Sequence, residues 1–333
     1  MQVHSMAALE RGAQLTPWQY NTPPLGPYDC IIRVRSCGLC HSDIHIIDGD
    51  FPAQYPVVPG HEAVGEIIEK GSMVNHLEIG QRVGVGWQRS SCLQCPDCLK
   101  GNENLCSQGT TTVMHGYGGF GNHIFMDSRF CFAIPDGIDT EAAGPLLCAG
   151  VTVYSALRSA GMTSGQNIGI IGVGGLGHLA VQFASRLGNR VTVFTTSPDK
   201  AEFAAKMGAH ESVLTEKGEK PHTSQPQDII ISTVPADLVW SDYVNLLGTD
   251  GTLTFVGIAP KPISIPMLSL LDKRRRIMGS PIGGRAVMTK MLEVADTFGI
   301  APVIETFPMK QANEAIQKVR DNTVRYRAVL TMD

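Results

Sequence analysis

The sequence has no long hydrophobic run and little excess charge of either sign. Its 333 residues carry 27 Lys and Arg against 31 Asp and Glu, a formal net charge of −4 with neutral histidines. No stretch approaches the roughly 18 apolar residues that span a membrane. The single basic run, Lys273 to Arg276, lies between apolar residues and is expected on a solvated face or loop. Nucleic acid and anionic membranes are therefore not expected partners, because both bind a concentrated basic surface.

An export signal is also missing. Residues 1–10 lack the cationic start and the apolar core of a signal peptide, so we expect a cytoplasmic protein. Its nine cysteines then indicate free thiols or metal ligands, because the cytosol keeps cysteines reduced and an odd number cannot pair completely. The hydrophobic fraction of 43% and the charged fraction of 17% are those of a globular protein, which excludes disorder as the main state. The length predicts about two domains.

The sequence changes character near residue 147. Up to residue 146, short β-prone runs are separated by Gly and Pro clusters, which predicts an irregular, mostly β domain. Residues 147–284 alternate apolar runs with helical stretches, which predicts a doubly wound α/β domain with a parallel sheet. The last segment, about 285–333, ends in a strand-like run and is expected to complete the first domain. The strands predicted in the second domain are 167–172, 190–196, 228–234, 251–257 and 276–279, with helices at 176–187 and 199–207.

Four cysteines form a C-x2-C-x2-C-x7-C cluster: Cys92, Cys95, Cys98 and Cys106. Four thiolates so close in sequence can converge on one tetrahedral Zn²⁺, and a closed shell of sulfur leaves no position for a substrate. The cluster therefore predicts a structural zinc site. An iron–sulfur cluster and a nucleic-acid-binding zinc ribbon are the alternatives. The seven-residue gap before Cys106 and the few basic residues of the loop favour structural zinc.

A second group of metal-binding side chains is spread along the chain. Cys40, His61 and Cys148 would supply two thiolates and one imidazole, a donor set that suits a zinc ion with an open position. The signal is of moderate specificity because the ligands lie far apart. The remaining thiols, Cys30, Cys37 and Cys131, are expected to be buried structural residues.

Residues 172–177 match the pattern G-x-G-x-x-G between a predicted strand and a predicted helix. In that setting Gly172 permits a tight turn, Gly174 lets the backbone approach a pyrophosphate, and Gly177 allows the helix to pack closely on the strand. The N-terminus of the helix then faces the phosphates. A dinucleotide site is therefore predicted, with a purely structural glycine turn as the alternative.

The end of the second predicted strand bears on the choice of cofactor. No carboxylate stands at its tip, where Thr195, Thr196 and Ser197 are followed by Lys200. Short hydroxyls and a cation accept a 2′-phosphate, whereas an NAD site usually has an acidic residue there. NADP(H) is therefore favoured, and Asp199 would reverse this prediction if the strand ended later.

In combination, the motifs resemble the zinc-dependent medium-chain dehydrogenases/reductases and, within them, the cinnamyl-alcohol-dehydrogenase-like group. The resemblance extends from Ala7 to Asp333 and is strongest to bacterial NADPH-dependent broad-range aldehyde reductases. It rests on several motifs in the same order and spacing, which is more specific than any single one. These motifs are CGLCHSD at 37–43, PGHE at 59–62, the cysteine cluster at 92–106, GPLLCAG at 144–150, GVGGLGH at 172–178 and GSPIGG at 279–284.

This resemblance implies a GroES-like catalytic domain, residues 1–146 completed by about 285–333, and a Rossmann domain, residues 147–284, that binds NADP(H). Cys40, His61 and Cys148 would ligate a catalytic zinc that Glu62 can join, which makes two zinc ions per chain with the cysteine cluster. The resemblance further implies an orienting role for Asp43 at His61, a proton relay through Ser42 and His45, and a substrate-pocket position for Trp87, with an ordinary core tryptophan as the alternative at that position. The positions that match cofactor contacts are His41, Ser42, Thr152, Gly172, Val173, Gly174, Gly175, Leu176, Gly177, Thr195, Thr196, Ser197, Lys200, Thr233, Gly257, Ser280, Pro281 and Ile282.

The implied function is the reversible reduction of aldehydes to primary alcohols by hydride transfer from NADPH. The nearer alternative is an NAD-dependent alcohol or polyol dehydrogenase. A non-enzymatic zinc- and nucleotide-binding sensor would lack one of the ligand or relay residues and would show basic residues clustered around the cysteine cluster. This sequence has all of the ligand and relay residues and no such basic clustering. Family membership implies a homodimer or homotetramer, while the residues themselves do not identify the physiological substrate.

Overall fold

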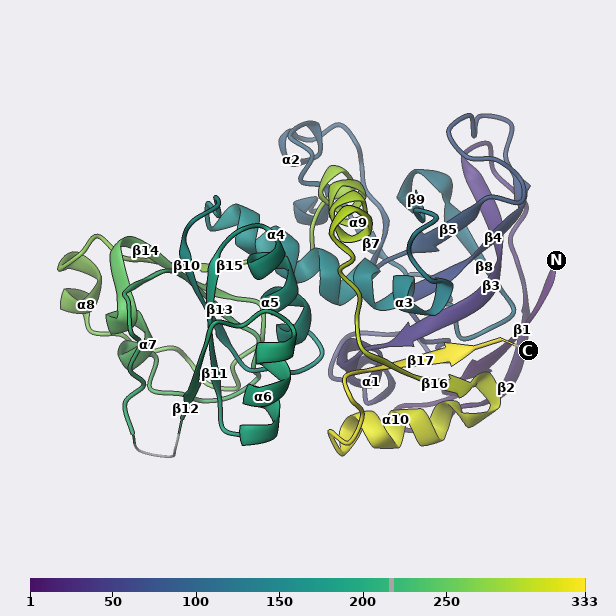
Figure 1. Cartoon of the computed structure of the whole chain (residues 1–333). Helices are drawn as coiled ribbons and strands as arrows, with labels where there is room; N and C mark the ends of the chain where they lie inside the picture. Colours follow the sequence, from purple (N-terminus) through teal and green to yellow (C-terminus); the bar gives the residue numbers. More distant parts are fainter. Residues whose placement is uncertain (216–218, 333) are drawn as a thin grey trace. The chain divides into compact units, whose positions relative to one another are not determined.

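The computed structural model describes residues 1–215 and 219–332, and it divides into two compact units (Figure 1). The first unit comprises Met1–Cys148 and Gly283–Asp333, and the second comprises Ala149–Ile282. Residues 216–218 and 333, which the predicted domain ranges include, lie outside the described residues. Among the described helices, none has the length and hydrophobicity that crossing a membrane requires.

The first unit is built on a seven-stranded sheet with strand order β16-β17-β3-β4-β5-β9 and with β8 paired to β3. Its long central strand β3 (Asp29–Leu39) pairs antiparallel with β17, which lies near the end of the chain. The C-terminal segment therefore belongs to the same sheet as the N-terminal third. The other strands are β4 (Glu62–Lys70), β5 (Arg82–Val85), β8 (His123–Asp127), β9 (Cys131–Ala133), β16 (Ile304–Pro308) and β17 (Arg327–Thr331).

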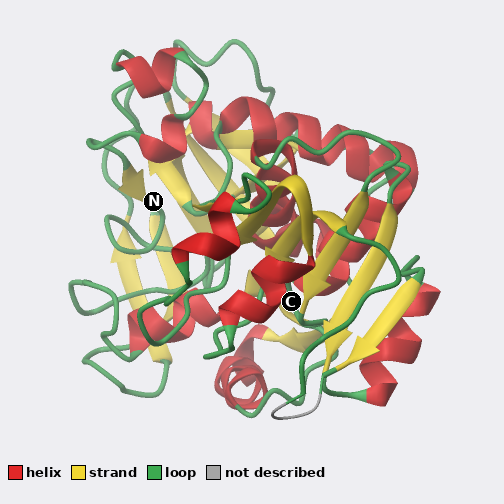
Figure 2. Cartoon of the chain, turned by 90° about the vertical axis from the view of Figure 1, so that its left-hand side faces the viewer, coloured by secondary structure: helices red, strands yellow, loops and turns green. Residues whose placement is uncertain are grey.

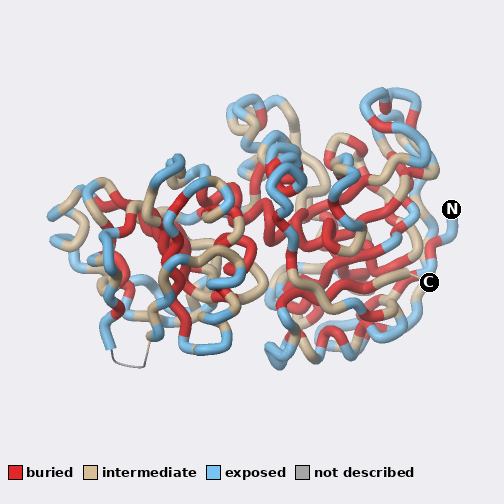
Figure 3. Tube along the Cα trace, in the orientation of Figure 1, coloured by how far each residue is buried: buried red, intermediate tan, exposed pale blue. Residues whose placement is uncertain are grey.

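Short elements surround this sheet. Two small sheets, formed by β1 (Gln2–Ala7) with β2 (Thr16–Asn21) and by β6 (Gln88–Ser90) with β7 (Thr110–Thr111), lie outside it. The buried parts of the chain follow the strands of the large sheet (Figure 3). The helices of this unit are α1 (His41–Ile47), α2 (Pro96–Leu99), α3 (Thr140–Pro145), α9 (Arg285–Phe298) and α10 (Ala312–Arg320), with 3-10 turns η1 (Glu103–Leu105), η2 (Ser128–Phe130) and η4 (Met309–Gln311).

The second unit contains a six-stranded parallel sheet with strand order β12-β11-β10-β13-β14-β15 (Figure 2). The fully buried isoleucines of β10 and β13 give the continuous apolar runs of a sheet covered on both faces. The strands are β10 (Asn167–Ile171), β11 (Arg190–Thr195), β12 (Glu211–Leu214), β13 (Gln227–Ser232), β14 (Leu247–Phe255) and β15 (Arg276–Gly279), and the helices are α4 (Val151–Ser159), α5 (Gly177–Arg186), α6 (Pro198–Lys206), α7 (Trp240–Leu246) and α8 (Met267–Leu271).

The strand order reverses at β10. From β10 the chain moves outward to β11 and β12, and it then returns to place β13 on the other side of β10. Ligands of such sheets bind beyond the carboxyl ends of the strands at this reversal. The fold therefore places the glycine loop, which follows β10, and Thr233, which follows β13, at the edge of the sheet where this rule predicts a ligand.

The basic run at 273–276 is more structural than expected. Arg274 and Arg276 approach the Asp250 carboxylate at 2.6 and 3.9 Å. Arg275 is 8% exposed, and its guanidinium donates to the carbonyl oxygens of Leu247 and Ser269 at 2.9 and 2.7 Å. The expectation of a solvated run is therefore wrong for Arg275, which satisfies backbone carbonyls that burial would otherwise leave unpaired.

Candidate functional site

Four metal-binding side chains meet in the interior of the first unit. The donor atoms of Cys40, His61, Glu62 and Cys148 lie within 4.8 Å of one another, and all four residues are buried. Cys40 is the N-cap of α1, and Glu62 begins β4. Cys148 lies in a π-helical turn at Leu146–Gly150, a backbone form that is rare and frequent at functional sites. The fold thus brings together ligands that are more than 100 residues apart in the sequence.

Asp43 fixes the orientation of the imidazole. Its Oδ1 lies 2.9 Å from His61 Nδ1 and accepts the backbone N–H of Gly60 at 2.8 Å. Its Oδ2 accepts the backbone N–H of Cys40 at 3.1 Å. A proton held on Nδ1 by the carboxylate leaves the lone pair on Nε2, which lies 3.3 Å from Cys148 Sγ. His61 is therefore held in the tautomer that can ligate a metal.

The protonation of the two thiols depends on their contact with each other. The hydrogen bond from Cys148, followed by burial and the hydrogen bond with His61, sets the pKa of Cys40, which lies well below its usual value. The same hydrogen bond, together with burial, raises the pKa of Cys148. Burial also raises the pKa of Glu62 to about 7. A bound cation would reverse this balance by favouring the deprotonated form of each ligand.

The residues fit a zinc ion. Two soft sulfurs, one borderline imidazole nitrogen and a hard carboxylate oxygen form a mixed donor set of ligand types that Zn²⁺ accepts. Glu62 Oε2 is a buried oxygen without a hydrogen-bond partner, which is costly unless another group meets it. A divalent cation among these donors would supply the missing positive charge.

Arg327 is a site residue that the sequence reading missed. Its guanidinium, 5% exposed, forms an ion pair and a hydrogen bond with Glu62 Oε1. Burial opposes the charge of Arg327, but Glu62 and Cys40 hold its pKa above the ordinary value. No local pattern marks an arginine in a short strand as functional. Only the pairing of β17 with β3 places it beside a carboxylate 265 residues away.

The predicted relay residues lie on α1. His45 Nδ1 is 2.9 Å from the Asp50 carboxylate, which the sequence reading also missed. The ring of Trp87 lies edge-on to the ring of His61, with centroids 5.0 Å apart. Phe51 completes a row of rings, 6.4 Å from Trp87 and 5.4 Å from His45. Aromatic side chains therefore connect the relay histidine to the buried imidazole.

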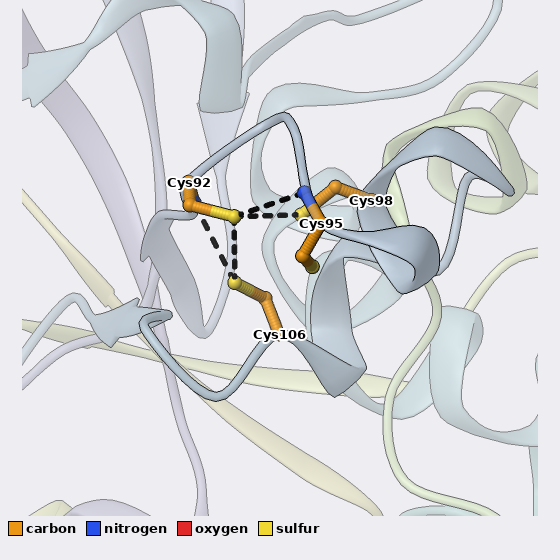
Figure 4. A group of neighbouring side chains, drawn as sticks. All are labelled: Cys92, Cys95, Cys98 and Cys106. Atoms are coloured by element: carbon orange, nitrogen blue, oxygen red, sulfur yellow. Dashed lines mark hydrogen bonds between the residues drawn. The ribbon is translucent and has the colours of Figure 1, made fainter.

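The cysteine cluster forms a second, separate metal-binding group (Figure 4). Cys92 Sγ lies 3.6 Å from Cys106 Sγ and 3.9 Å from Cys98 Sγ, and it accepts the backbone N–H of Cys95 at 3.3 Å. Backbone N–H groups lower the pKa of the Cys92 thiol to about 6, so that a thiolate forms readily. Within residues 91–107, Lys100 is the single basic side chain, which argues against a nucleic-acid-binding ribbon.

The glycine loop has the backbone geometry that its pattern predicts. Gly172 has φ +87°, and a Cβ there would lie 2.3 Å from Val234. A Cβ on Gly177 would lie 1.9 Å from the carbonyl oxygen of Gly172, so that the helix could not pack so closely. At Gly174 a Cβ would meet nothing within 4 Å, which leaves its backbone open to a ligand. The remaining loop residues, Val173, Gly175 and Leu176, connect these positions.

The tip of β11 ends without a carboxylate. The hydroxyl of Thr195 accepts the N–H of Ser197 at 3.3 Å, and the hydroxyl of Ser197 caps α6 by accepting the N–H of Lys200 at 3.4 Å. Asp199 lies in the first turn of α6, and Thr196 is exposed at the strand end. The other predicted cofactor positions of this unit are Thr152 in α4 and, beyond the carboxyl ends of β13, β14 and β15, Thr233, Gly257, Ser280, Pro281 and Ile282.

Comparisons with known proteins agree over the whole chain. Family models match residues 26–136, as an alcohol dehydrogenase GroES-like domain, and residues 175–297, as a zinc-binding dehydrogenase. The aldehyde reductase AdhA of a Synechocystis species is 38% identical over 331 residues, which cover 99% of this chain and 98% of the relative. A cinnamyl alcohol dehydrogenase from Sorghum bicolor superposes with a TM-score of 0.92 at 34% identity, covering 99% of this chain and 98% of that chain.

The chain belongs to the zinc-binding alcohol dehydrogenases. A further structure in this group, a cinnamyl alcohol dehydrogenase from Helicobacter pylori complexed with NADP(H), has a TM-score of 0.90 at 30% identity and covers 99% of this chain and 98% of that chain. The predicted resemblance to the cinnamyl-alcohol-dehydrogenase-like group is confirmed, as is the predicted fold class of a GroES-like domain with a Rossmann domain. Among the described residues of this zinc-binding dehydrogenase, the two cysteine-containing groups have side chains arranged so that they could hold a metal ion.

Arg327→Met is expected to lower the free energy of unfolding by about 3–5 kcal/mol, because it leaves the buried Glu62 carboxylate without its ion-pair partner. The raised pKa of Glu62, about 7, sets the pH dependence. Below its ordinary pKa the carboxyl is neutral in both states and adds no penalty. Arg327 lowers that pKa, so in the variant the pKa of Glu62 in the folded state lies above 7. The parent stops losing stability once Glu62 is ionised above pH 7, whereas the variant continues to lose it, so the deficit relative to the parent grows toward alkaline pH. Urea unfolding of the variant across this range measures it.

The matched control is the double variant Glu62→Gln/Arg327→Met, which removes both charges. It should recover most of the lost stability and should lose the pH dependence, because no buried carboxylate remains. A double variant as unstable as Arg327→Met would contradict the ion-pair explanation.

Proposed function

We propose that the protein is an NADPH-dependent reductase that converts aldehydes to primary alcohols in a reversible reaction. The observation that carries this proposal is the buried set of Cys40, His61, Glu62 and Cys148, in which Cys40 is the N-cap of the helix that carries the relay histidine. The aldehyde reductase AdhA, 38% identical over almost the whole chain, supports the same reaction. An NAD-dependent alcohol or polyol dehydrogenase is the second candidate, and the position of Asp199 near the strand tip is the feature that favours it.

In this proposal, Cys40, His61 and Cys148 hold a catalytic zinc, and the four cysteines from Cys92 to Cys106 hold a structural one. When bound, the catalytic zinc supplies a Lewis acid for the aldehyde oxygen and NADPH supplies the hydride. Asp43 keeps the lone pair of His61 directed at the site. Arg327 holds Glu62 by one oxygen, which leaves Oε2 free to approach the same site.

The chain itself supplies the proton. The Ser42 hydroxyl donates to the oxygen of the reduced substrate and is reprotonated through His45. The Asp50 carboxylate accepts from Nδ1 of His45 and leaves Nε2 as the end that exchanges the proton. In the oxidative direction the same groups remove the proton of the alcohol.

We assign the nucleotide to the carboxyl edge of the parallel sheet, with the pyrophosphate on residues 172–177. Thr195, Thr196, Ser197 and Lys200 receive the 2′-phosphate. The residues that match further cofactor contacts are His41, Ser42, Thr152, Thr233, Gly257 and residues 280–282. We divide the domains as residues 1–146 with about 285–333, and residues 147–284.

The substrate is an aldehyde with a flat, conjugated group. Trp87 and Phe51 present partly buried rings beside the metal-binding side chains, and such rings stack on flat apolar groups. A polyol would require several buried hydrogen-bond partners in their place. We also propose that the protein acts in the cytoplasm, where its nine free cysteines remain reduced.

The decisive experiment is the initial rate of NADPH and NADH oxidation with butanal, benzaldehyde and cinnamaldehyde. We expect chelator-sensitive turnover with NADPH, and a larger kcat/KM for the two aromatic aldehydes than for butanal. No turnover with either cofactor, in protein that contains both zinc ions, would refute the proposed reaction. Faster turnover with NADH would favour the second candidate.

Two cysteine variants separate the metal sites. Cys40→Ser is expected to lower kcat by at least about a thousandfold while NADPH still binds, because the ligand lies outside the nucleotide-binding sheet. Its matched control, Cys95→Ser, should instead destabilise the loop at 92–106 and lower the zinc content from two to one per chain. Metal analysis and NADPH titration measure both, and loss of NADPH binding in Cys40→Ser would argue against separate roles.

Thr196→Asp is expected to shift cofactor preference toward NADH by about tenfold to a hundredfold, because a carboxylate at the strand tip repels the 2′-phosphate and can accept the ribose hydroxyl. The ratio of kcat/KM for the two cofactors measures the shift. Thr196→Asn, which has a similar shape without the charge, is the control and should shift the ratio little. An unchanged ratio in Thr196→Asp would place the 2′-phosphate elsewhere.

We further propose that the protein is a homodimer through the edge of the parallel sheet. Strand β15 is an edge strand, and the neighbouring α8 exposes Met267, Leu268 and Leu271 at 66%, 74% and 67%. An exposed edge strand beside an apolar helix is suited to pair with a second copy. Leu268→Glu should convert the dimer to a monomer in light scattering, and Leu99→Glu, another exposed leucine, should not. A monomeric parent protein would refute this.

A further inference from the structure

Two cysteines outside both metal-binding groups lie in contact. Cys30 Sγ and Cys131 Sγ are 3.5 Å apart although the residues are 101 positions apart in the sequence. Cys30 is fully buried and Cys131 is 5% exposed. The third cysteine of this kind, Cys37, is also buried, but its thiol hydrogen bond goes to the carbonyl oxygen of Gly38. The structure therefore contains a pair of thiols that the proposed metal chemistry does not use.

The pair lies at a seam of the large sheet. Cys30 is on β3, where its neighbours are Met126 of β8 and Lys70 of β4. Cys131 begins β9, which pairs with β5. The turn η2 joins β8 to β9, and no ladder among the described strands pairs these two with each other. The thiols thus join β3 and β9, two strands of the sheet that no described ladder pairs directly.

The hydrogen bonds give the two sulfurs different roles. The Cys131 thiol donates to the carbonyl oxygen of Asp127 at 3.6 Å. A thiol has one proton, so the contact between the sulfurs is made by the Cys30 S–H donating to Cys131 Sγ. Cys131 is also the more exposed of the two. An incoming oxidant therefore reaches Cys131 first, and Cys30 already points at the sulfur that would be oxidised.

We propose that Cys30 and Cys131 are a modification site, a dithiol that hydrogen peroxide oxidises to a disulfide. The Cys131 sulfur attacks one peroxide oxygen, the O–O bond breaks, and the sulfur becomes a sulfenic acid as the first water leaves. The Cys30 sulfur then attacks Cys131 Sγ, the S–O bond breaks, and a second water leaves with the remaining thiol proton. Two thiols and one peroxide thus give one disulfide and two waters, and a dithiol reductant reverses the change.

Burial sets the rate of this reaction. Burial raises the pKa of the Cys131 thiol, so that little thiolate is present at neutral pH. The nucleophile is the thiolate, and oxidation is therefore slow and accelerates with rising pH. The second step is intramolecular between touching sulfurs, so the sulfenic acid should not accumulate.

The disulfide would close a loop that contains most of the metal-binding residues. His61, Glu62 and the cysteine cluster all lie between residues 30 and 131. A crosslink over so long a loop restricts the unfolded chain and raises the unfolding temperature. The sulfurs already touch, so the folded state requires a small adjustment, and both metal sites and the aldehyde activity should be retained.

The test is graded hydrogen peroxide treatment of the zinc-loaded protein, followed by alkylation under denaturing conditions and mass spectrometry. We expect the loss of two hydrogen atoms per chain, a crosslinked peptide that joins Cys30 to Cys131, and an unfolding temperature several degrees higher, all reversed by dithiothreitol. The zinc content should remain at two per chain. These readouts do not use catalytic activity, so they fail or succeed independently of the proposed function.

Three variants make the result specific. Cys30→Ala and Cys131→Ala should each abolish the crosslink and the rise in unfolding temperature, whereas Cys37→Ala, a buried thiol without a sulfur partner, should keep both. Full alkylation of Cys30 and Cys131 in protein whose zinc cysteines have already been oxidised would overturn the proposal. Stable sulfinic acid at Cys131 without a crosslink would overturn it as well.

Discussion

The burial of negative charge around one point in the first unit is the constraint on which the rest of the site depends. Cys40, Cys148 and Glu62 are buried donors whose anionic forms burial disfavours and nearby positive charge or hydrogen-bond donors favour. Arg327 supplies part of that charge from the last strand of the chain. The return of the C-terminal segment to pair with β3 is therefore more than a topological detail, because it carries the counter-ion of Glu62 into the interior.

The short helix α1 connects this constraint to the proton path. Its N-cap is Cys40, and its first turn carries Asp43, which holds His61. Its C-terminal end is equally well fixed, because the Tyr55 hydroxyl donates to the carbonyl oxygen of Ile46, and Asp48 forms a two-point ion pair with Arg320 of α10. A helix of seven residues is marginal alone, so these contacts at both ends keep the metal ligand and the relay residues in a fixed relation.

The sequence predicted those parts of the site whose residues lie close together in a short motif. The spacing of a short motif predicts its geometry. This holds for the four cysteines within 15 residues and for the glycine loop between a strand and a helix, and the structure places both groups as their spacing predicts. Arg327 and Asp50 could not be found in this way, because an ion pair across 265 residues depends on strand pairing that no spacing reveals. Arg275 was misread for the same reason, since its carbonyl partners come from other elements.

The two cysteine-rich groups differ in what holds their surroundings together. The open set lies among buried strands, which would keep their fold through hydrophobic packing in the absence of a metal. The loop from Cys92 to Cys106 has no comparable core, because Leu99 and Leu105 are 75% and 50% exposed and Leu93 has a positive φ. Its leucines stabilise little, so the four sulfur ligands must supply the binding energy that orders it. At Cys40, His61 and Cys148 the fold would position the metal, whereas at the cysteine cluster the metal would order the loop.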